Sequence, residues 1–364
     1  MKKILFVFGT RPEAIKCCPV VLEMQKRNNF NVKVCVTGQH REMLKQVLNA
    51  FSICPDYDLA VMKESQTLFS LTANILSSIQ AVLEQEKPDI VLVHGDTTTA
   101  FAAGLASFYL KIPVGHIEAG LRTYNLYSPF PEEYNRQAIG LVAKYHFSPT
   151  EAAKENLLRE GKNPDTIWVT GNTSIDALKT TVRSDYSHGL LDWVGDRRLI
   201  VLTAHRRENC GEPLRQMLRA IRRVADRFPD IAIIFPAHLN PVVQETAREI
   251  LGDSENVKII PPMDVIDFHN IVAHSYIVLT DSGGIQEEAP ALGKPVLVMR
   301  DTTERPEGVA AGTLRLVGTE EESIYQAFVD LLTNQDIYAA MSHASNPYGD
   351  GFASKRIADV LAEE

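Results

Sequence analysis

A short apolar run passes directly into a helix start at Ile4-Leu5-Phe6-Val7-Phe8-Gly9-Thr10-Arg11-Pro12-Glu13-Ala14-Ile15-Lys16. Five apolar residues bounded by glycine are typical of a buried strand, and Pro12 suits the first turn of a helix. Arg11 and Lys16 lie at this helix start, where free backbone N–H groups and cations both attract phosphate. An ordinary capped turn with two surface cations would have the same residues. The stretch therefore predicts a strand–helix unit and leaves its function open.

The same alternation of short apolar runs and helical periods continues along the chain. Apolar residues recur every three or four positions from Leu68 to Leu83 and again from Leu214 to Phe228, which predicts two amphipathic helices. Strands that alternate with helices favour an α/β fold with parallel sheets. The expected strands are 4–8, 32–36, 90–93, 114–117, 145–147 and 167–169 in the first half, and 199–202, 231–235, 257–260, 276–279 and 296–299 in the second.

The strand–helix pattern restarts in the middle of the chain. A length of 364 residues suits two domains, and the stretch 189–198 is polar and irregular. We expect two Rossmann-like domains, over residues 1–175 and 176–345, with the junction between about Thr173 and Asp196. Ligands of open α/β sheets bind at the carboxyl ends of the strands, which predicts a central cleft between the domains.

Composition excludes several classes of partner. Hydrophobic residues make up 45 % and charged residues 23 %, as in ordinary folded proteins, and the net charge of −9 argues against nucleic acid. No stretch offers the ~18 apolar residues of a membrane span, and the first apolar run is too short for a signal peptide. Five cysteines without paired spacing predict no disulfide frame and no zinc site, and they favour the cytoplasm.

Carboxylates follow two expected strands of the first half. Asp96 comes just after 90–93, where a helix cap is an equally simple explanation, and Glu118 lies in a glycine-bordered loop after 114–117. Glu132 and Glu133 begin a helix behind two prolines, a position that the helix dipole alone would favour for acids. For Asp96, Glu132 and Glu133 the structural and functional explanations both stay open, whereas Glu118 is less easily explained by structure alone.

The second half places a histidine and a glycine pair after its strands. His205 corresponds in position to the first loop of the other half, which favours a functional role. Ser282, Gly283 and Gly284 open a helix whose N–H groups suit a diphosphate, and Glu288 suits a ribose hydroxyl pair. Pro290 predicts that this helix is short or kinked. Arg305 follows the next strand as a further cation.

Other nucleotide and catalytic motifs are missing from the sequence. The sequence has no GxGxxG, which argues against a nicotinamide cofactor, and no Walker A, HExxH or GxSxG motif. His116 and Glu118 lack the later Pro-Cys-x-x-Cys of a zinc deaminase.

Taken together, the motifs FGTRPEAIK, VLVHGDTTT, HIEAGLRT, YSPFPEE, HRRE, LTDSGGIQEEAP and RDTTERPE resemble the bacterial non-hydrolysing UDP-N-acetylglucosamine 2-epimerases. The resemblance runs from the first strand to Asn346-Pro347-Tyr348-Gly349-Asp350-Gly351. It implies a glycosyltransferase-B-like fold, a helix in residues 346–364 that packs back on the first domain, a homodimer, and no cofactor or metal. Ala204 and Cys17-Cys18 are small departures from the family pattern.

The resemblance also implies roles for individual residues. The acid/base candidates are Asp96, Glu118, Glu132 and His205. The nucleotide contacts are Arg11, Lys16, Phe268, Ser282, Gly283, Gly284, Glu288 and Arg305. Some relatives bind a second UDP-N-acetylglucosamine as an activator, and the residues that match this pattern are Gln39, His40, Arg206 and His238. Glu42 and Ser65 differ from the regulated relatives.

The implied reaction is reversible epimerisation of UDP-N-acetylglucosamine to UDP-N-acetylmannosamine for bacterial surface polysaccharides. No carbonyl acidifies the C2 proton, so we expect UDP to leave first and a glycal to form before UDP adds again. Asp96 and Glu118 would move protons at C2, with Glu132 assisting, while His205, Arg11 and Arg305 stabilise UDP. The alternatives are a UDP-sugar glycosyltransferase of the same fold, an epimerase of a 6-deoxy amino sugar nucleotide, a hydrolysing epimerase, and a sensor without turnover.

Overall fold

The computed structural model describes residues 1–38, 41–62, 66–206 and 209–363. The chain divides into two compact units. Unit 1 comprises Met1–Thr180 and Tyr348–Glu364, and unit 2 comprises Thr181–Pro347. The chain therefore leaves unit 1 once and returns to it for its last residues.

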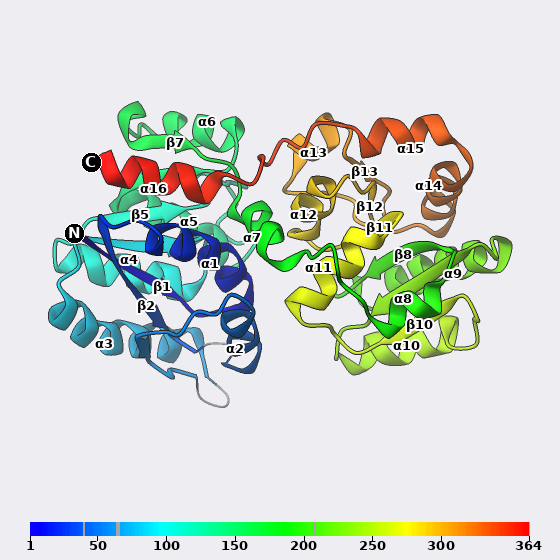
Figure 1. Cartoon of the computed structure of the whole chain (residues 1–364), viewed down its shortest axis with the longest axis horizontal. Helices are drawn as coiled ribbons and strands as arrows, with labels where there is room; N and C mark the ends of the chain where they lie inside the picture. Colours follow the sequence, from blue (N-terminus) through cyan, green and yellow to red (C-terminus); the bar gives the residue numbers. More distant parts are fainter. Residues whose placement is uncertain (39–40, 63–65, 207–208, 364) are drawn as a thin grey trace. The chain divides into compact units, whose positions relative to one another are not determined.

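Unit 1 is a parallel sheet with helices on both faces (Figure 1). Its strands are β1 (Lys2–Phe8), β2 (Phe30–Val36), β3 (Tyr57–Asp58), β4 (Ile90–His94), β5 (Val114–Ile117), β6 (Ala143–Ser148) and β7 (Ile167–Val169). Its helices are α1 (Arg11–Gln25), α2 (Arg41–Ala50), α3 (Leu68–Glu86), α4 (Thr98–Tyr109), α5 (Glu132–Val142), α6 (Glu151–Arg159), α7 (Thr173–Thr181) and α16 (Ala353–Glu363), with a 3₁₀ turn at Pro164–Thr166.

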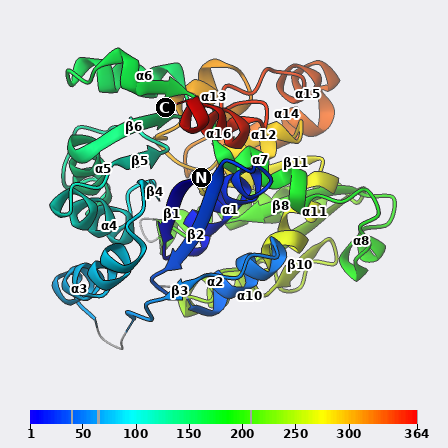
Figure 2. The same ribbon diagram turned by 60° about the vertical axis from the view of Figure 1, so that its left-hand side comes forward.

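The strand order in unit 1 is β3-β2-β1-β4-β5-β6-β7. The chain builds outward from β1 in one direction and then from β4 in the other, so β1 and β4 are neighbours at the point where the order reverses. Helices α3, α4 and α5 cover one face through a shared apolar core, and α1 and α16 lie on the other (Figure 2). Loops after β1 and β4 meet at this reversal, where open α/β sheets bind ligands.

Helix α16, the last helix of the chain, belongs to the first unit. It packs along α1, where Asp359 pairs with Arg27 at 2.7 Å, and Lys2 donates to the carbonyl of Leu361 at 2.8 Å. The buried carboxylate of Asp176 accepts the backbone N–H groups of Ala353 at 3.2 Å and Ser354 at 2.7 Å. This carboxylate satisfies donors that a helix N-terminus otherwise leaves unpaired.

Unit 2 repeats the same architecture. Its strands are β8 (Arg198–Thr203), β9 (Ile231–Pro236), β10 (Val257–Ile260), β11 (Ile277–Thr280), β12 (Val296–Val298) and β13 (Leu314–Leu316). Its helices are α8 (Gly189–Val194), α9 (Glu212–Arg227), α10 (Pro241–Leu251), α11 (Val265–His274), α12 (Ile285–Ala291), α13 (Pro306–Ala310), α14 (Glu321–Thr333) and α15 (Gln335–Ser342). The strand order is β10-β9-β8-β11-β12-β13, so the reversal lies between β8 and β11.

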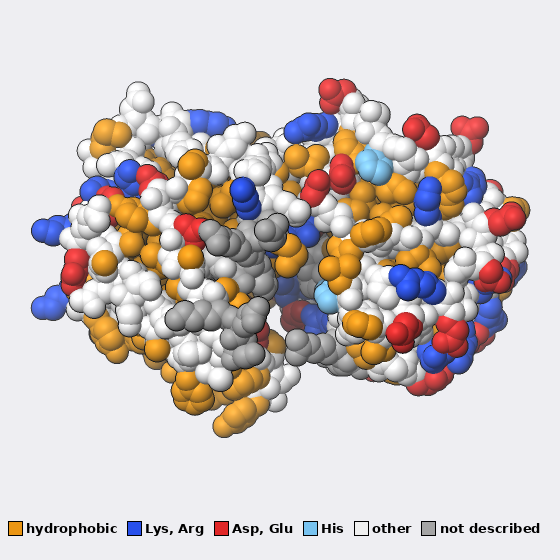
Figure 3. All heavy atoms as spheres, turned by 90° about the horizontal axis from the view of Figure 1, so that it is seen from below, with side chains coloured by type: hydrophobic (Ala, Val, Ile, Leu, Met, Phe, Trp, Pro, Cys, Tyr) orange, Lys and Arg blue, Asp and Glu red, His pale blue; other side chains and the backbone are white. Residues whose placement is uncertain are grey.

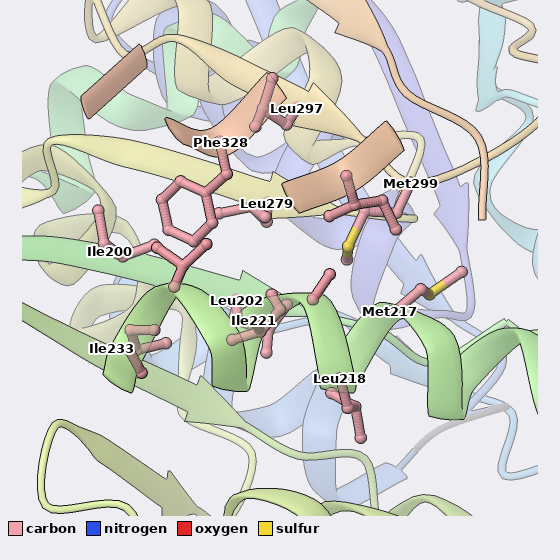
Figure 4. Close-up of a cluster of buried hydrophobic side chains, with 14 of the residues drawn as sticks. Ile200, Leu202, Met217, Leu218, Ile221, Ile233, Leu279, Leu297, Met299 and Phe328 are labelled. Atoms are coloured by element: carbon pink, nitrogen blue, oxygen red, sulfur yellow. The ribbon is translucent and has the colours of Figure 1, made fainter. Parts of the chain in front are cut away.

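Alternating residues of β8 supply both cores of unit 2. Ile200 and Leu202 pack with the apolar stripe of α9 and with Phe328 of α14 (Figure 4). Leu199 and Val201 face the opposite side and pack with residues of α8, α11 and α12. This period of two is the expected pattern for a strand buried on both faces.

The expected α/β class is confirmed, and each expected strand is present within a few residues. Two strands were missed. Strands β3 and β13 have two and three residues, too few to show a pattern. The stretch 189–198 was wrongly expected to be irregular, because the side chain of His188 caps the short helix α8 by accepting the N–H of Leu190 at 3.0 Å. None of the described helices has the length and apolar character needed to cross a membrane.

The cap on α16 gives a stability prediction. Replacing Asp176→Ala leaves two N–H groups at a buried helix end without an acceptor, which should cost about 1–2 kcal/mol in the free energy of unfolding. Equilibrium urea unfolding measures this loss. The control Asp359→Ala removes a more exposed ion pair of the same helix and should cost less than about 1 kcal/mol. Equal losses for the two variants would contradict this role of Asp176.

Candidate functional site

In unit 1, a buried glutamate joins the two loops at the reversal of the sheet. Oε2 of Glu13 accepts the N–H groups of Gly9 at 3.0 Å and Thr10 at 2.8 Å, and Oε1 accepts the hydroxyl of Thr97 at 2.6 Å. Burial raises the pKa of Glu13, although these hydrogen bonds oppose that rise. The loop after β1 and the loop after β4 are therefore held together, with Arg11 at the first position of α1.

Asp96 follows β4 and is held by α5. Its Oδ2 accepts from Nη2 of Arg136 at 2.6 Å, and its backbone carbonyl accepts from the side chain of Asn135 at 2.9 Å. Burial raises the pKa of Asp96, Arg136 lowers it, and the negative charges of Glu118 and Glu132 raise it further. A quarter of the Asp96 side chain stays exposed. The charges of three candidate acids therefore interact at one edge of the sheet.

Glu118 directly follows β5 and has a backbone conformation that glutamate seldom adopts. Its φ is +66°, in the left-handed region. Its Oε1 pairs with the ammonium of Lys16 and accepts from the side chain of Asn172 at 3.1 Å. Nε2 of His94 lies 3.9 Å from the same oxygen. Strained residues of this kind concentrate at functional sites. Lys16, which is expected to contact the nucleotide, forms an ion pair with this carboxylate.

The structure separates the two adjacent acids at the start of α5. Glu133 is fully buried and accepts the N–H groups of Thr123 and Tyr124, both at 3.0 Å. Burial alone would raise the pKa of Glu133, but hydrogen bonds from Gln137 and from these N–H groups lower it overall. Glu133 therefore has a structural role. Glu132 is half-buried, and its charge acts on Asp96.

Three buried histidines lie on neighbouring strands of unit 1. They are His94 on β4, His116 on β5 and His146 on β6, and the last two are register partners. Burial lowers the pKa of His94 to about 4, of His116 to about 3 and of His146 to about 4. In each ring one nitrogen has no hydrogen-bond partner: Nε2 of His94 and Nδ1 of the other two. All three are therefore neutral near pH 7.

In unit 2, a buried aspartate joins the loops after β8 and β11, where the strand order of the sheet reverses. Asp281 follows β11 and is fully buried. It accepts the N–H groups of His205 at 3.0 Å and Arg206 at 2.9 Å, and the side chain of Asn209 at 3.0 Å. Nδ1 of His205 lies 3.2 Å from Oδ1 of Asp281. Burial alone would raise the pKa of Asp281, but the hydrogen bonds from His205 and Arg206 lower it.

Sequence reasoning missed both joining carboxylates. Asp281 stood directly before the Ser-Gly-Gly stretch, and Glu13 stood three residues after Thr10, at the spacing of a capping box. That spacing was the available indication for Glu13, whose capping box with Thr10 is present. For Asp281, its place immediately after a buried strand was the only indication.

Gly283 lies beside two guanidinium groups. A Cβ placed on Gly283 would lie 3.0 Å from Oε1 of Glu304, 3.9 Å from Nη2 of Arg305 and 4.0 Å from Nη2 of Arg206. Helix α12 after this glycine has only seven residues, as Pro290 predicted. The arginines are therefore the stronger attraction for an anion here, more than the helix dipole.

The remaining nucleotide candidates surround the same loop. Arg305 is held by the buried Glu287 through Nε at 2.5 Å. The Oε1 atom of Glu288 lies near Gly284, and its Oε2 lies 3.5 Å from Nε2 of the buried His269. Phe268 is half-buried on α11 and packs against the core of that face. Ser282 joins β11 to this loop, with its N–H donated to Thr280 at 2.9 Å.

The candidates for an activator site are placed only in part. Gln39 and His40 lie outside the described residues. Arg206 belongs to the group around Gly283, because its Nε donates to the carbonyl of Asp281 at 2.9 Å. His238 stacks on His205 with ring centroids 6.2 Å apart. Across the residues that the structure describes, no group of three or more His, Cys, Asp or Glu residues is arranged to hold a metal ion.

Comparison with known proteins gives one consistent result. A family model described as UDP-N-acetylglucosamine 2-epimerase matches residues 22–362. The UDP-N-acetylglucosamine 2-epimerase of Bacillus subtilis (strain 168) is 61% identical over 359 residues, which cover 99% of this chain and 94% of that protein.

Solved structures agree. The crystal structure of UDP-GlcNAc 2-epimerase from Neisseria meningitidis bound to UDP-GlcNAc has a TM-score of 0.92 and 52% identity, with 100% of both chains covered. The Methanocaldococcus jannaschii UDP-GlcNAc 2-epimerase in complex with UDP-GlcNAc and UDP has a TM-score of 0.84 and 34% identity, also over 100% of both chains. A glycosyltransferase from Rickettsia africae ESF-5 shares the fold alone, with a TM-score of 0.63 and 15% identity.

The buried histidines predict how stability depends on pH. An unfolded imidazole takes up a proton below about pH 6.5, whereas the folded rings resist protonation until the pH nears their pKa values of about 3 to 4. The contribution of these neutral histidines to the free energy of unfolding is therefore complete above pH 6.5 and is lost as the pH falls toward 4. We expect His146→Gln to reduce the slope of unfolding free energy against pH by up to about 1.4 kcal/mol per pH unit between pH 6 and 4.5.

Urea unfolding at a series of pH values measures this slope. The control His343→Gln removes a histidine outside this group and should keep the wild-type slope. An unchanged slope in His146→Gln would show that His146 is not held neutral by burial.

Proposed function

Because this chain belongs to the UDP-N-acetylglucosamine 2-epimerase family, we propose that it interconverts UDP-N-acetylglucosamine and UDP-N-acetylmannosamine by inversion at C2. The proposed route is elimination of UDP to a glycal, followed by re-addition of UDP. Residues 1–175 would supply the acid/base groups, and residues 176–345 would bind UDP.

The observation that carries this proposal is the group of interacting acids in unit 1. The charges of Glu118 and Glu132 both act on Asp96. Inversion at C2 requires removal of a proton from one face and delivery to the other, so more than one acid/base group is needed. A raised pKa suits Asp96 to exchange protons, and Glu118, whose Oε1 is bound by Lys16 and Asn172, would be a second proton-transfer group.

The chemistry at C1 requires cations near the departing diphosphate. As the C1–O bond breaks, negative charge develops on UDP and positive charge on the sugar, which makes the C2 proton removable. Nη2 of Arg305 and Nη2 of Arg206 lie close to Gly283, where they would stabilise the diphosphate. Arg11 at the start of α1 would add a further cation.

His205 would bind the same leaving group. Its Nδ1 faces the buried Asp281, an arrangement that favours a proton on Nδ1 and directs Nε2 away from this carboxylate. The side chain is 42% exposed, so it is accessible to a ligand. Asp281 is therefore proposed as the positioning residue of His205.

The assembly, the pathway and the compartment are further proposals. Large apolar side chains are exposed on α3, α4 and α5, which pack side by side: Phe69 at 90%, Leu141 at 78%, and also Phe108 and Tyr109. Figure 3 shows hydrophobic side chains on the surface of unit 1. We propose a homodimer through these helices. The five cysteines, all free, support a cytoplasmic location, and the product class supports a role in surface polysaccharides.

The reaction is tested by proton NMR of UDP-N-acetylglucosamine with the purified protein in D2O, without NAD or added metal. We expect the manno isomer to form with deuterium at C2. Asp96→Asn and Glu118→Gln should each slow turnover by about 100-fold or more, because each removes a proton-transfer group. Glu151→Gln, on the exposed start of α6, removes a charge elsewhere in unit 1 and should turn over like the wild type.

Each other result points to a different activity. Free UDP together with free N-acetylmannosamine would identify a hydrolysing epimerase. An unchanged spectrum with both isomers supplied would exclude the proposed substrate and favour a 6-deoxy amino sugar nucleotide or a glycosyltransferase lacking its acceptor.

The proposed dimer is tested by sedimentation velocity. Leu141→Glu and Phe108→Glu place a charge on the apolar surface of α4 and α5 and should convert dimer to monomer, because an unpaired charge is costly in a buried interface. Leu239→Glu, at an exposed apolar residue of unit 2, is the control. A wild-type monomer, or dimers in all three variants, would exclude this interface.

A further inference from the structure

One carboxylate in unit 2 is surrounded by three arginines. Oε1 of Glu304 accepts from Nη2 of Arg206 at 2.9 Å and lies 3.9 Å from Nη1 of Arg305. Its Oε2 accepts from Nη1 of Arg300 at 2.7 Å. We call these four residues the Glu304 cluster. Burial alone would raise the pKa of Glu304, but the three arginines lower it to about 2, so the carboxylate is ionised at neutral pH.

The arginines of this cluster are oriented by other groups as well. Buried Glu287 holds Nε of Arg305 at 2.5 Å, and the carbonyl of Asp281 accepts from Nε of Arg206 at 2.9 Å. The guanidinium ends therefore have a fixed direction that does not depend on Glu304 alone. Fixed cations of this kind suit a binding site for a charged ligand.

The Glu304 carboxylate lies where the diphosphate is expected. Its Oε1 is the nearest atom to a Cβ placed on Gly283, at 3.0 Å, ahead of the guanidinium nitrogens of Arg305 and Arg206 at 3.9 and 4.0 Å. An anion that bound both guanidinium groups beside Gly283 would have to share this space with the carboxylate. Two anions in one place repel each other strongly.

We propose that Glu304 is an internal counter-anion, which binds Arg206 and Arg305 beside Gly283 while no nucleotide is present and releases them to the diphosphate of UDP. This inference rests on the proposed function, because it takes UDP as the ligand. It assigns Glu304 a role opposite to that of a nucleotide contact: it competes with the diphosphate.

The surroundings of Glu304 allow this exchange. Its side chain is 30% exposed and lies between β12 and α13. The residues on either side are anchored: Thr303 donates to Gln286 at 2.6 Å, and Arg305 is bound to Glu287. The carboxylate can therefore turn toward solvent while the backbone of the loop stays in place.

The exchange has a use in an elimination reaction. UDP must be held while the glycal exists, yet the product must leave afterwards. An internal anion that returns to the arginines lowers the affinity for UDP and UDP-sugars. It also offsets the repulsion between the three guanidinium groups when no diphosphate is bound.

The test compares the affinity of wild type, Glu304→Gln and Glu304→Ala for UDP and for uridine by isothermal titration calorimetry. Removing the competing charge should tighten UDP binding by about ten-fold. Uridine lacks the diphosphate, so its affinity should stay unchanged. The control Asp301→Asn removes an exposed acid of the same loop and should bind UDP like the wild type.

Each outcome of the titrations supports or overturns the proposed role of Glu304. Tighter UDP binding in both Glu304 variants, with uridine unaffected, supports the counter-anion. Unchanged or weaker UDP binding in folded variants overturns it, and a weaker affinity would show that Glu304 stays in place to orient the arginines. Equal tightening by Asp301→Asn also overturns it, because general charge would then explain the effect. If wild type binds no UDP, the proposed function fails instead.

Discussion

A buried carboxylate that accepts backbone N–H groups where the strand order reverses is the interaction on which each candidate site depends. Glu13 in unit 1 binds the N–H groups after β1 and the hydroxyl of Thr97 after β4. Asp281 in unit 2 follows β11 and binds the N–H groups of His205 and Arg206 after β8. Neighbouring parallel strands end at the same edge of the sheet, but the loops that follow them lack the regular backbone hydrogen bonds that align the strands. The carboxylates provide that alignment for the loops that carry Asp96 in unit 1 and His205 and Arg206 in unit 2.

The sequence was sufficient for the fold class and for the positions of the strand ends, because fully buried parallel strands are short apolar runs that stand out from helical periods. It was not sufficient to sort one acid from the next. Glu132 and Glu133 have the same local sequence pattern. Only the tertiary structure shows that the Glu133 carboxylate accepts the N–H groups of Thr123 and Tyr124. The roles of Glu13, Asp281 and Glu304 likewise depend on partners tens of residues away, or on burial that no local pattern records. The ion pair between Lys16 and Glu118 likewise joins residues far apart in the sequence, so no local pattern predicted it.

Four cations near the candidate sites form ion pairs with carboxylates of their own unit. Lys16 is paired with Glu118, Arg136 with Asp96, Arg305 with Glu287 and Arg206 with Glu304. Buried charges need such partners, since an unpaired ion away from water is costly. The pairs therefore stabilise the site-bearing loops and also define what a ligand must replace. A carboxylate such as Asp96, whose side chain remains partly exposed, is available for chemistry, whereas a fully buried one such as Glu133 is not.

The division of the chain has a consequence for its synthesis on the ribosome. Unit 2 is one continuous segment, Thr181–Pro347, and all of its strands are translated before α16. Unit 1 begins first but gains α16, with its contacts to α1 and Asp176, only from the final residues. The half of the molecule translated first is thus the last to be completed, and the surface of α1 that α16 covers stays open to chaperones throughout translation. A chain truncated before Ala353 would lack a helix of unit 1, whereas the continuous segment of unit 2 would be intact.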